Sequence, residues 1–281
     1  GPRAHRSLDM PGLTLGSLFL LGINVALLQA HAWGWASPAI AASWVAAVAA
    51  LLLFVVRERT TAEPAVRLSV LGSRAFVGSA LVGGAAWFGI LSGSVQLSIY
   101  LQTTRGLDAT GAALVFLPWP LVAALLFPRS GQIVARLGPE RVMIGSLVIA
   151  AAAGAAMVGF DTATPLPIVS LVSAVGGVPI ALGVTASTVI ALSGFAPEEA
   201  GVASGVFNSL RQVGSSLGVA VPAAVFDLAV AGSPGDPLAG SAAAFASRAV
   251  VFAIVLALVV AILPRSRVAA PASQSQTAPA D

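Results

Sequence analysis

The chain has 281 residues, of which 57% are hydrophobic and only 9% are charged, and its formal net charge is +3. Soluble domains carry about 25% charged residues, so this composition excludes a soluble globular protein and indicates a polytopic membrane protein. There is no cysteine, and His5 and His31 lie outside the apolar runs. We therefore expect no metal site, no cofactor and no enzymatic activity.

Eight apolar runs are long enough to cross a bilayer as helices, which takes about 18 residues or more. In chain order they cover residues 13–30, 38–56, 76–100, 110–127, 142–160, 167–192, 203–230 and 246–263. The sequence therefore predicts an all-α polytopic membrane protein with eight transmembrane helices. Four prolines inside these runs predict kinked helices: Pro118, Pro120, Pro179 and Pro222.

The basic residues, all 14 of them arginine, report membrane topology rather than nucleic-acid binding. The first residues, the second and fourth connections and the tail together hold 11 arginines, and the opposite connections hold only Arg105 and Arg248. The positive-inside rule therefore places both ends of this chain in the cytoplasm, in an inner or plasma membrane. The remaining arginine, Arg211, lies inside an apolar span. Placing an arginine at the centre of a bilayer costs roughly 3 kcal/mol or more of free energy, so such a residue usually faces a bundle interior or a water-filled cavity.

Residues 201–218, GVASGVFNSLRQVGSSLG, hold this arginine on an amphipathic helix. At 100° per residue, one face carries the polar side chains of Ser204, Asn208, Arg211, Gln212 and Ser215. In one interpretation, Asn208, Arg211, Gln212 and Ser215 line a central cavity or hold its cytoplasmic gate.

In the other interpretation, the glycine pairs Gly201/Gly205 and Gly214/Gly218 form a close-packed seam. Arg211 then snorkels to the membrane surface or pairs with a carboxylate such as Glu198 or Glu199. The sequence alone leaves both interpretations open.

Two further groups of residues are candidates for function. Ser92, Gln96 and Tyr100 recur every four residues on one face of the third span, where they would either bind a drug-like ligand or hydrogen-bond a neighbouring helix. The turn between the fourth and fifth spans carries two glycines that permit a tight turn and two arginines that can bind helix carbonyls, a carboxylate or lipid phosphate: Gly131, Gly138, Arg136 and Arg141.

This turn resembles the loop motif of the major facilitator superfamily, in its C-terminal-half copy. That motif has an Asp-Arg pair between its glycines, and here Ala135 replaces the aspartate that belongs to the gating charge network. Three segments, YLQTTRGL at 100–107, GAALVFLP at 111–118 and the 201–218 helix, resemble the fourteen-span drug/proton antiporter branch in order and spacing.

The resemblance implies an organisation for the whole chain, as spans seven to fourteen of such a transporter. The implied parts are a cytoplasmic linker at 1–12, two extra transmembrane helices at 13–56, a second cytoplasmic linker at 57–75, a C-terminal six-helix bundle at 76–264 and a disordered cytoplasmic tail at 265–281. The N-terminal six-helix bundle is then missing from this sequence, and we expect the chain to be a fragment of a longer protein.

No acidic residue falls in the middle of a predicted span. A proton-coupled carrier needs a carboxylate that takes up and releases a proton within the membrane, and the resemblance implies that this group lies in the N-terminal bundle. We therefore expect a transporter that exports drug-like amphipathic compounds, with protons as the coupling ion, when that bundle is present. The alternative is a non-transporting fragment or membrane scaffold derived from such a transporter.

Overall fold

The computed structural model describes residues 10–61, 72–196, 200–233 and 236–263. Within these ranges the secondary structure is helical: α1 (Met10–Trp33), α2 (Pro38–Thr60), α4 (Arg74–Ile99), a π-helical turn (Tyr100–Thr104), α5 (Ala109–Phe116), α6 (Pro118–Leu137), α7 (Pro139–Val158), α8 (Leu166–Ser193), α9 (Ala200–Gly232) and α10 (Pro237–Ile262). They make eight segments long and apolar enough to span a membrane, because α4 continues into the π turn and α5 into α6. The predicted all-α fold of eight transmembrane helices is confirmed.

Two helices extend well beyond their predicted spans. α10 begins at Pro237, nine residues before the predicted start, because the Asp236 carboxylate caps it by accepting from the backbone N–H groups of Leu238 and Ala239. α6 continues to Leu137, ten residues past the predicted end, and stops at Gly138, whose φ of 87° favours glycine. The predicted spans left out both extensions, because small or charged residues lower the local hydropathy in these two segments.

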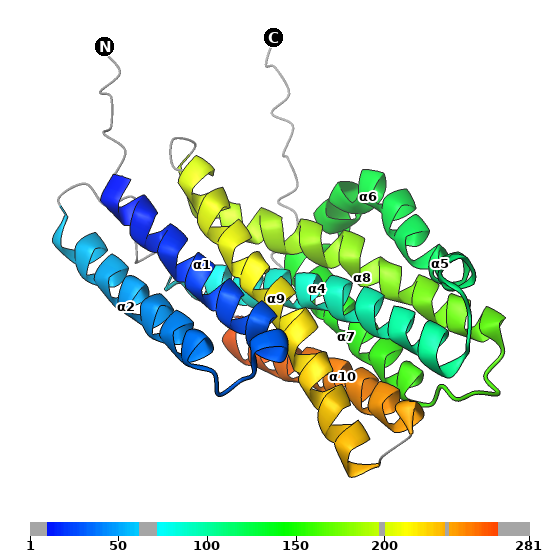
Figure 1. Cartoon of the computed structure of the whole chain (residues 1–281). Coiled ribbons are helices and arrows are strands. Elements are labelled where there is room, and N and C mark those ends of the chain that lie inside the picture. The colour runs from blue at the N-terminus through cyan, green and yellow to red at the C-terminus, as the bar shows by residue number, and fades with distance from the viewer. Residues whose placement is uncertain (1–9, 62–71, 197–199, 234–235, 264–281) are drawn as a thin grey trace, which may run out of the picture.

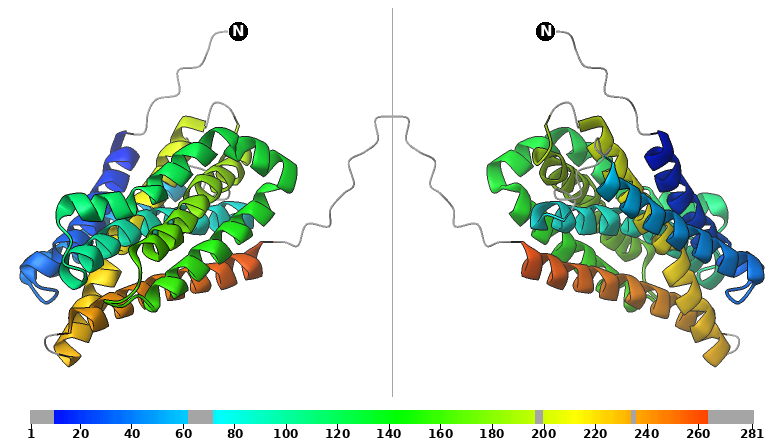
Figure 2. Two further views of the ribbon diagram at one scale, coloured as in Figure 1. Left: turned by 90° about the vertical axis from the view of Figure 1, so that its right-hand side faces the viewer. Right: turned by 90° about the vertical axis from the view of Figure 1, so that its left-hand side faces the viewer.

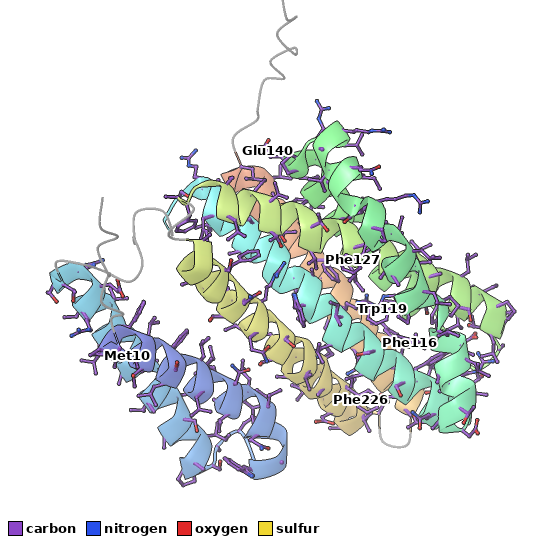
Figure 3. The ribbon with its side chains drawn as sticks, turned by 90° about the horizontal axis from the view of Figure 1, so that it is seen from above. Met10, Phe116, Trp119, Phe127, Glu140 and Phe226 are labelled. Carbon is purple, nitrogen blue, oxygen red and sulfur yellow. The ribbon has the colours of Figure 1, made fainter. Side chains whose placement is uncertain are left out.

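The helices form a bundle with a pair of helices at its side (Figures 1 and 2). α4 lies inside the bundle and packs against α8, α9 and α10, while α7 packs against α8 and α10, and α6 against α8. α1 and α2 pack against each other, and α1 also packs against α9. Seen from above, this pair lies apart from the remaining helices (Figure 3). The Ser216 hydroxyl of α9 donates a hydrogen bond to Asn24 Oδ1 and so links α1 to α9.

The bundle is held by apolar packing at small residues. Its main core gathers Val82, Phe88, Met143, Leu147 and Phe252 from α4, α7 and α10. Where α6 crosses α8, a Cβ on Gly177 would lie 2.3 Å from the Trp119 carbonyl oxygen, so only glycine permits this approach.

The four prolines for which kinks were predicted lie at two kinds of place, with Pro118 and Pro120 in the first turn of α6 and the other two inside helices. Pro118 begins α6 directly after Leu117, where α5 and α6 part, because a proline has no N–H for the preceding turn and its ring crowds the carbonyl there. Pro179 and Pro222 lie inside α8 and α9. The predicted tail 265–281 and most of the predicted linkers 1–12 and 57–75 lie outside the described residues.

Candidate functional site

The polar face of α9 is directed towards α8, away from the apolar face of the same helix. Arg211 contacts α8, Asn208 and Gln212 are exposed, and Ser215 is buried with 8% exposure. Leu210 and other residues of the apolar face lie on the side of α1. The structure therefore keeps the division between two faces that the sequence predicts for this helix.

Arg211 is half-buried and has specific polar partners. Its Nη2 donates to Thr188 Oγ1 at 2.6 Å and to the Val184 carbonyl at 3.3 Å, and its Nη1 donates to Asn208 Oδ1 at 3.2 Å. The guanidinium carbon lies 4.5 Å from the centroid of the Phe207 ring, which adds a cation–π contact. The side chain thus ties α9 to α8. The alternative partners Glu198 and Glu199 lie outside the described residues.

The two glycine pairs of α9 differ in their surroundings. A Cβ on Gly214 would lie 2.2 Å from the Gly84 carbonyl oxygen, and one on Gly218 would lie 2.5 Å from that of Phe88. Among the described residues, nothing lies within 4 Å of a Cβ built on Gly201 or Gly205. The predicted seam is therefore present at Gly214/Gly218, against α4, and the prediction is wrong for Gly201/Gly205, because no described helix packs closely on α9 there.

Ser92 and Gln96 lie inside the bundle and are buried, with 0% and 2% exposure. The Ser92 hydroxyl and both amide atoms of Gln96 have no hydrogen-bond partner among the described residues. Tyr100, one turn further on, begins the π turn, which shifts the register of the helix. The shift therefore falls after Tyr100, and Ser92, Gln96 and Tyr100 keep the four-residue spacing predicted for them.

Tyr100 lies buried at the end of the bundle where α4 ends, opposite the end where α4 begins at Arg74. Its ring packs against Phe160 and Phe245, and its hydroxyl donates to the Asp161 carbonyl at 2.7 Å. Arg105 donates through Nη1 to the Tyr100 hydroxyl at 3.3 Å and to the Thr164 carbonyl. This network joins the π turn to the connection between α7 and α8.

Asp161 stabilises that connection as an anion. One carboxylate oxygen, Oδ1, accepts from the Thr164 hydroxyl and from the backbone N–H groups of Thr164 and Ala163, at 2.7 to 2.9 Å. These hydrogen bonds, the one from the Thr164 hydroxyl above all, hold the pKa of Asp161 below its usual value, and nearby Arg105 lowers it slightly further.

Arg248 was expected in an outer connection, and this prediction is wrong. It lies inside α10, eleven residues past Pro237, and only 3% of its side chain is exposed. Its Nη1 donates to Met157 Sδ at 3.4 Å, and its guanidinium carbon is 5.8 Å from the centroid of the Phe252 ring. The pair Asp236-Pro237, a capping residue followed by proline, was the sequence signal for the earlier start of this helix.

The residues of the predicted loop motif divide between a helix and a turn. Gly138 forms the turn between α6 and α7, with the exposed side chains of Arg136 and Arg141 on either side. Gly131 lies inside α6, so its predicted part in the turn is wrong. α6 continues there because Ser130 bonds the Thr185 hydroxyl of α8 at 2.8 Å, which keeps this part of the helix packed.

A cavity of about 880 Å³ lies between the α1/α2 pair and the bundle. Its lining is almost entirely apolar and includes Phe19, Phe54, Phe88, Leu210 and Val251. None of the polar residues predicted from the sequence to contact a substrate lines it. This lining suits an acyl chain or another apolar group. No sequence pattern predicts the cavity, because its walls come from five helices.

The acidic residues in the described ranges lie at helix ends and in connections. Asp108 and Asp236 cap α5 and α10, Glu140 stands in the first turn of α7, and Asp227 lies near the end of α9. In the same ranges no group of three or more His, Cys, Asp or Glu side chains is arranged to hold a metal ion. The internal charged groups of the bundle are therefore the two arginines, Arg211 and Arg248.

Comparison with known proteins identifies the family. A family model of the Major Facilitator Superfamily matches residues 9–219. The chain is 31% identical over 224 residues to a methylenomycin A resistance protein of Streptomyces coelicolor, covering 78% of this chain and 46% of the relative. It is 30% identical over 289 residues to a cephamycin export protein of Amycolatopsis lactamdurans, covering 94% of this chain and 54% of the relative.

A multidrug resistance protein of Mycobacterium tuberculosis is 26% identical over 217 residues, covering 77% of this chain and 40% of the relative. The chain thus spans about half the length of the curated relatives it matches. The matched region begins before α1 and ends within α9, so it includes the α1/α2 pair and most of the bundle. The chain therefore belongs to the major facilitator superfamily, a family of membrane transporters and not of enzymes.

Proposed function

We propose that the chain forms the second half of a fourteen-span efflux transporter, with α1 and α2 as the extra pair and α4 to α10 as the C-terminal bundle. Relatives named for antibiotic resistance and export support this role. The substrate is a drug-like amphipathic small molecule, and the protein lies in the cell membrane with both ends of this chain in the cytoplasm.

The observation that carries the proposal is that α8 covers the polar face of α9 only in part. Arg211 lies eleven residues from the start of the helix, about 16 Å at 1.5 Å per residue, inside the segment that is long and apolar enough to span a membrane. Asn208 and Gln212 beside it are exposed. Polar side chains at this depth are costly against lipid and normally face a protein or a water-filled cavity. A second bundle facing α9 would give them such a cavity.

In this arrangement Asn208, Arg211, Gln212 and Ser215 form one wall of the substrate pathway or its cytoplasmic gate. The two bundles alternate between states open to either side of the membrane, as in other transporters built from repeats. Gly138 and the arginines Arg136 and Arg141 form a cytoplasmic contact between α6, α7 and the lipid or the facing bundle. Protons are the coupling ion, and their carboxylate lies in the facing bundle, because the described helices place no carboxylate at mid-membrane depth.

The same shortage of internal carboxylates favours a second candidate, a membrane scaffold that does not transport. The two are separated by expressing the chain in an efflux-deficient bacterium, alone and joined to the first six spans of the Streptomyces coelicolor relative. We expect the hybrid to raise the inhibitory concentration of methylenomycin A or cephamycin several-fold and to lose this effect when a protonophore is added.

The chain alone, at matched membrane abundance, is the control and should give no resistance. Export by the chain alone would refute the need for a facing bundle. A hybrid that inserts normally but confers no resistance to any compound tested would favour the scaffold.

A further inference from the structure

Arg248 is a buried charge that no part of the proposed transport pathway uses. It lies about 16 Å from the start of α10 at 1.5 Å per residue, and only 3% of its side chain is exposed. Among the described residues it makes no ion pair. Its contacts are the Met157 sulfur, which is a weak acceptor, and the distant Phe252 ring, and its Nε has no partner.

The guanidinium lies against the backbone of α4. A Cβ on Gly93 would be 3.3 Å from the guanidinium carbon and from both terminal nitrogens. Gln96 follows Gly93 by three residues and Ser92 precedes it by one, so at 100° per residue they lie about 60° and about 100° from Gly93, in the same direction around the helix. The unpaired Ser92 hydroxyl and Gln96 amide therefore lie on the side of α4 next to the face that the guanidinium contacts.

A donor from another helix, the indole N–H of Trp119 in α6, lies in the same region. Both this N–H and the arginine lie close to Gly176 in α8. A Cβ built on Gly176 would lie 3.3 Å from Trp119 Nε1 and 3.9 Å from Arg248 Nη2. Figure 3 shows Trp119 close to Phe116, where α5 meets α6, and the two rings are 4.7 Å apart. Ser241, two turns before Arg248 on α10, is also buried with an unpaired hydroxyl.

We propose that Arg248, Gln96, Ser92 and Trp119 form a binding site for a monovalent anionic group. Buried charges in proteins are normally paired, and buried polar groups are normally hydrogen-bonded. Here one cation, an amide, a hydroxyl and an indole N–H gather around two glycines, and no described carboxylate neutralises the cation. A chloride ion or the carboxylate of an acidic organic compound would supply both the missing charge and the missing acceptor.

The test measures thermal unfolding of the purified chain in detergent while sodium chloride rises from about 1 mM to about 300 mM, for the chain and for Arg248→Met. The methionine keeps an unbranched side chain of similar reach and removes the charge. We expect chloride to raise the unfolding midpoint of the unaltered chain by about 5 °C more than that of the variant. General salt effects act on both proteins and cancel in this difference.

A second arm replaces chloride by sodium benzoate at the same ionic strength. Stabilisation by benzoate at lower concentration than by chloride assigns the site to organic carboxylates, and the reverse order assigns it to the free ion. Arg248→Lys should keep a weaker response because it keeps the charge. Arg105→Met, which removes an arginine at the end of the bundle, should respond like the unaltered chain.

Equal responses of the unaltered chain and Arg248→Met to every anion would overturn the proposal. If Arg248→Met does not fold, Gln96→Leu is decisive, since it removes a flanking donor and must lower the response. The site is measured by unfolding and not by transport, so its failure and the failure of the proposed function are distinguishable.

Discussion

The seam between α9 and α4 offers a sharp test, because two glycines of the same helix meet opposite surroundings. In Gly214→Ala, the new Cβ would lie 2.2 Å from the Gly84 carbonyl oxygen and 2.7 Å from the Gly84 carbonyl carbon and Cα. All three are backbone atoms and cannot rotate away. Ordinary contact begins at 3.4 Å, so α9 would have to retreat by about 1.2 Å along that direction.

The expected cost follows from this displacement. Overpacking that shifts the backbone typically costs about 1 to 3 kcal/mol. Gly205→Ala is the matched control, because nothing lies within 4 Å of its Cβ and the position is exposed. There the only expected effect is the gain of about 0.5 to 1 kcal/mol that alanine brings to a helix interior.

The assay is unfolding of each variant in detergent, followed by circular dichroism. We expect Gly214→Ala to unfold about 2 to 10 °C below the unaltered chain and Gly205→Ala to unfold at or slightly above it. Equal stability of Gly214→Ala and Gly205→Ala would show that α9 and α4 do not approach closely at Gly214. It would also refute the division of the four glycines into a packed pair and an open pair.

Two other predictions concern charged groups. Arg211→Met in the hybrid transporter removes the hydrogen bonds to Thr188 and the Val184 carbonyl, and we expect at least a tenfold loss of export at unchanged membrane abundance; unchanged export would make Arg211 a packing residue. The lowered pKa of Asp161 means that its stabilising contribution is complete above pH ~3.8 and is lost only as the pH falls through the still lower folded-state pKa. Asp161→Ala should therefore lower the unfolding midpoint by the same amount from pH 8 to pH 5, and a difference that closes between pH 7 and pH 5 would contradict this account.

Helix boundaries show where prediction from sequence succeeded and where it stopped. Each apolar run became a helix because a membrane segment must satisfy its backbone hydrogen bonds internally. The ends were less certain, since a cap such as Asp236 or a turn glycine such as Gly138 ends a helix irrespective of hydropathy. Misplacing the start of α10 by nine residues was enough to put Arg248 in a connection instead of the bundle interior.

The sequence by itself determined the class of the protein, its eight membrane-spanning helices, its family and the two faces of α9. These properties follow from composition and from a period of 3.6 residues, both of which are local. Only the tertiary structure decided which neighbour each face meets: Arg211 bonds α8, Gly214 rests on Gly84, and Gly205 meets open space. A helix's own sequence repeats the same small residues along its length, whereas its contacts depend on where other helices cross it, and that crossing is a property of the whole bundle.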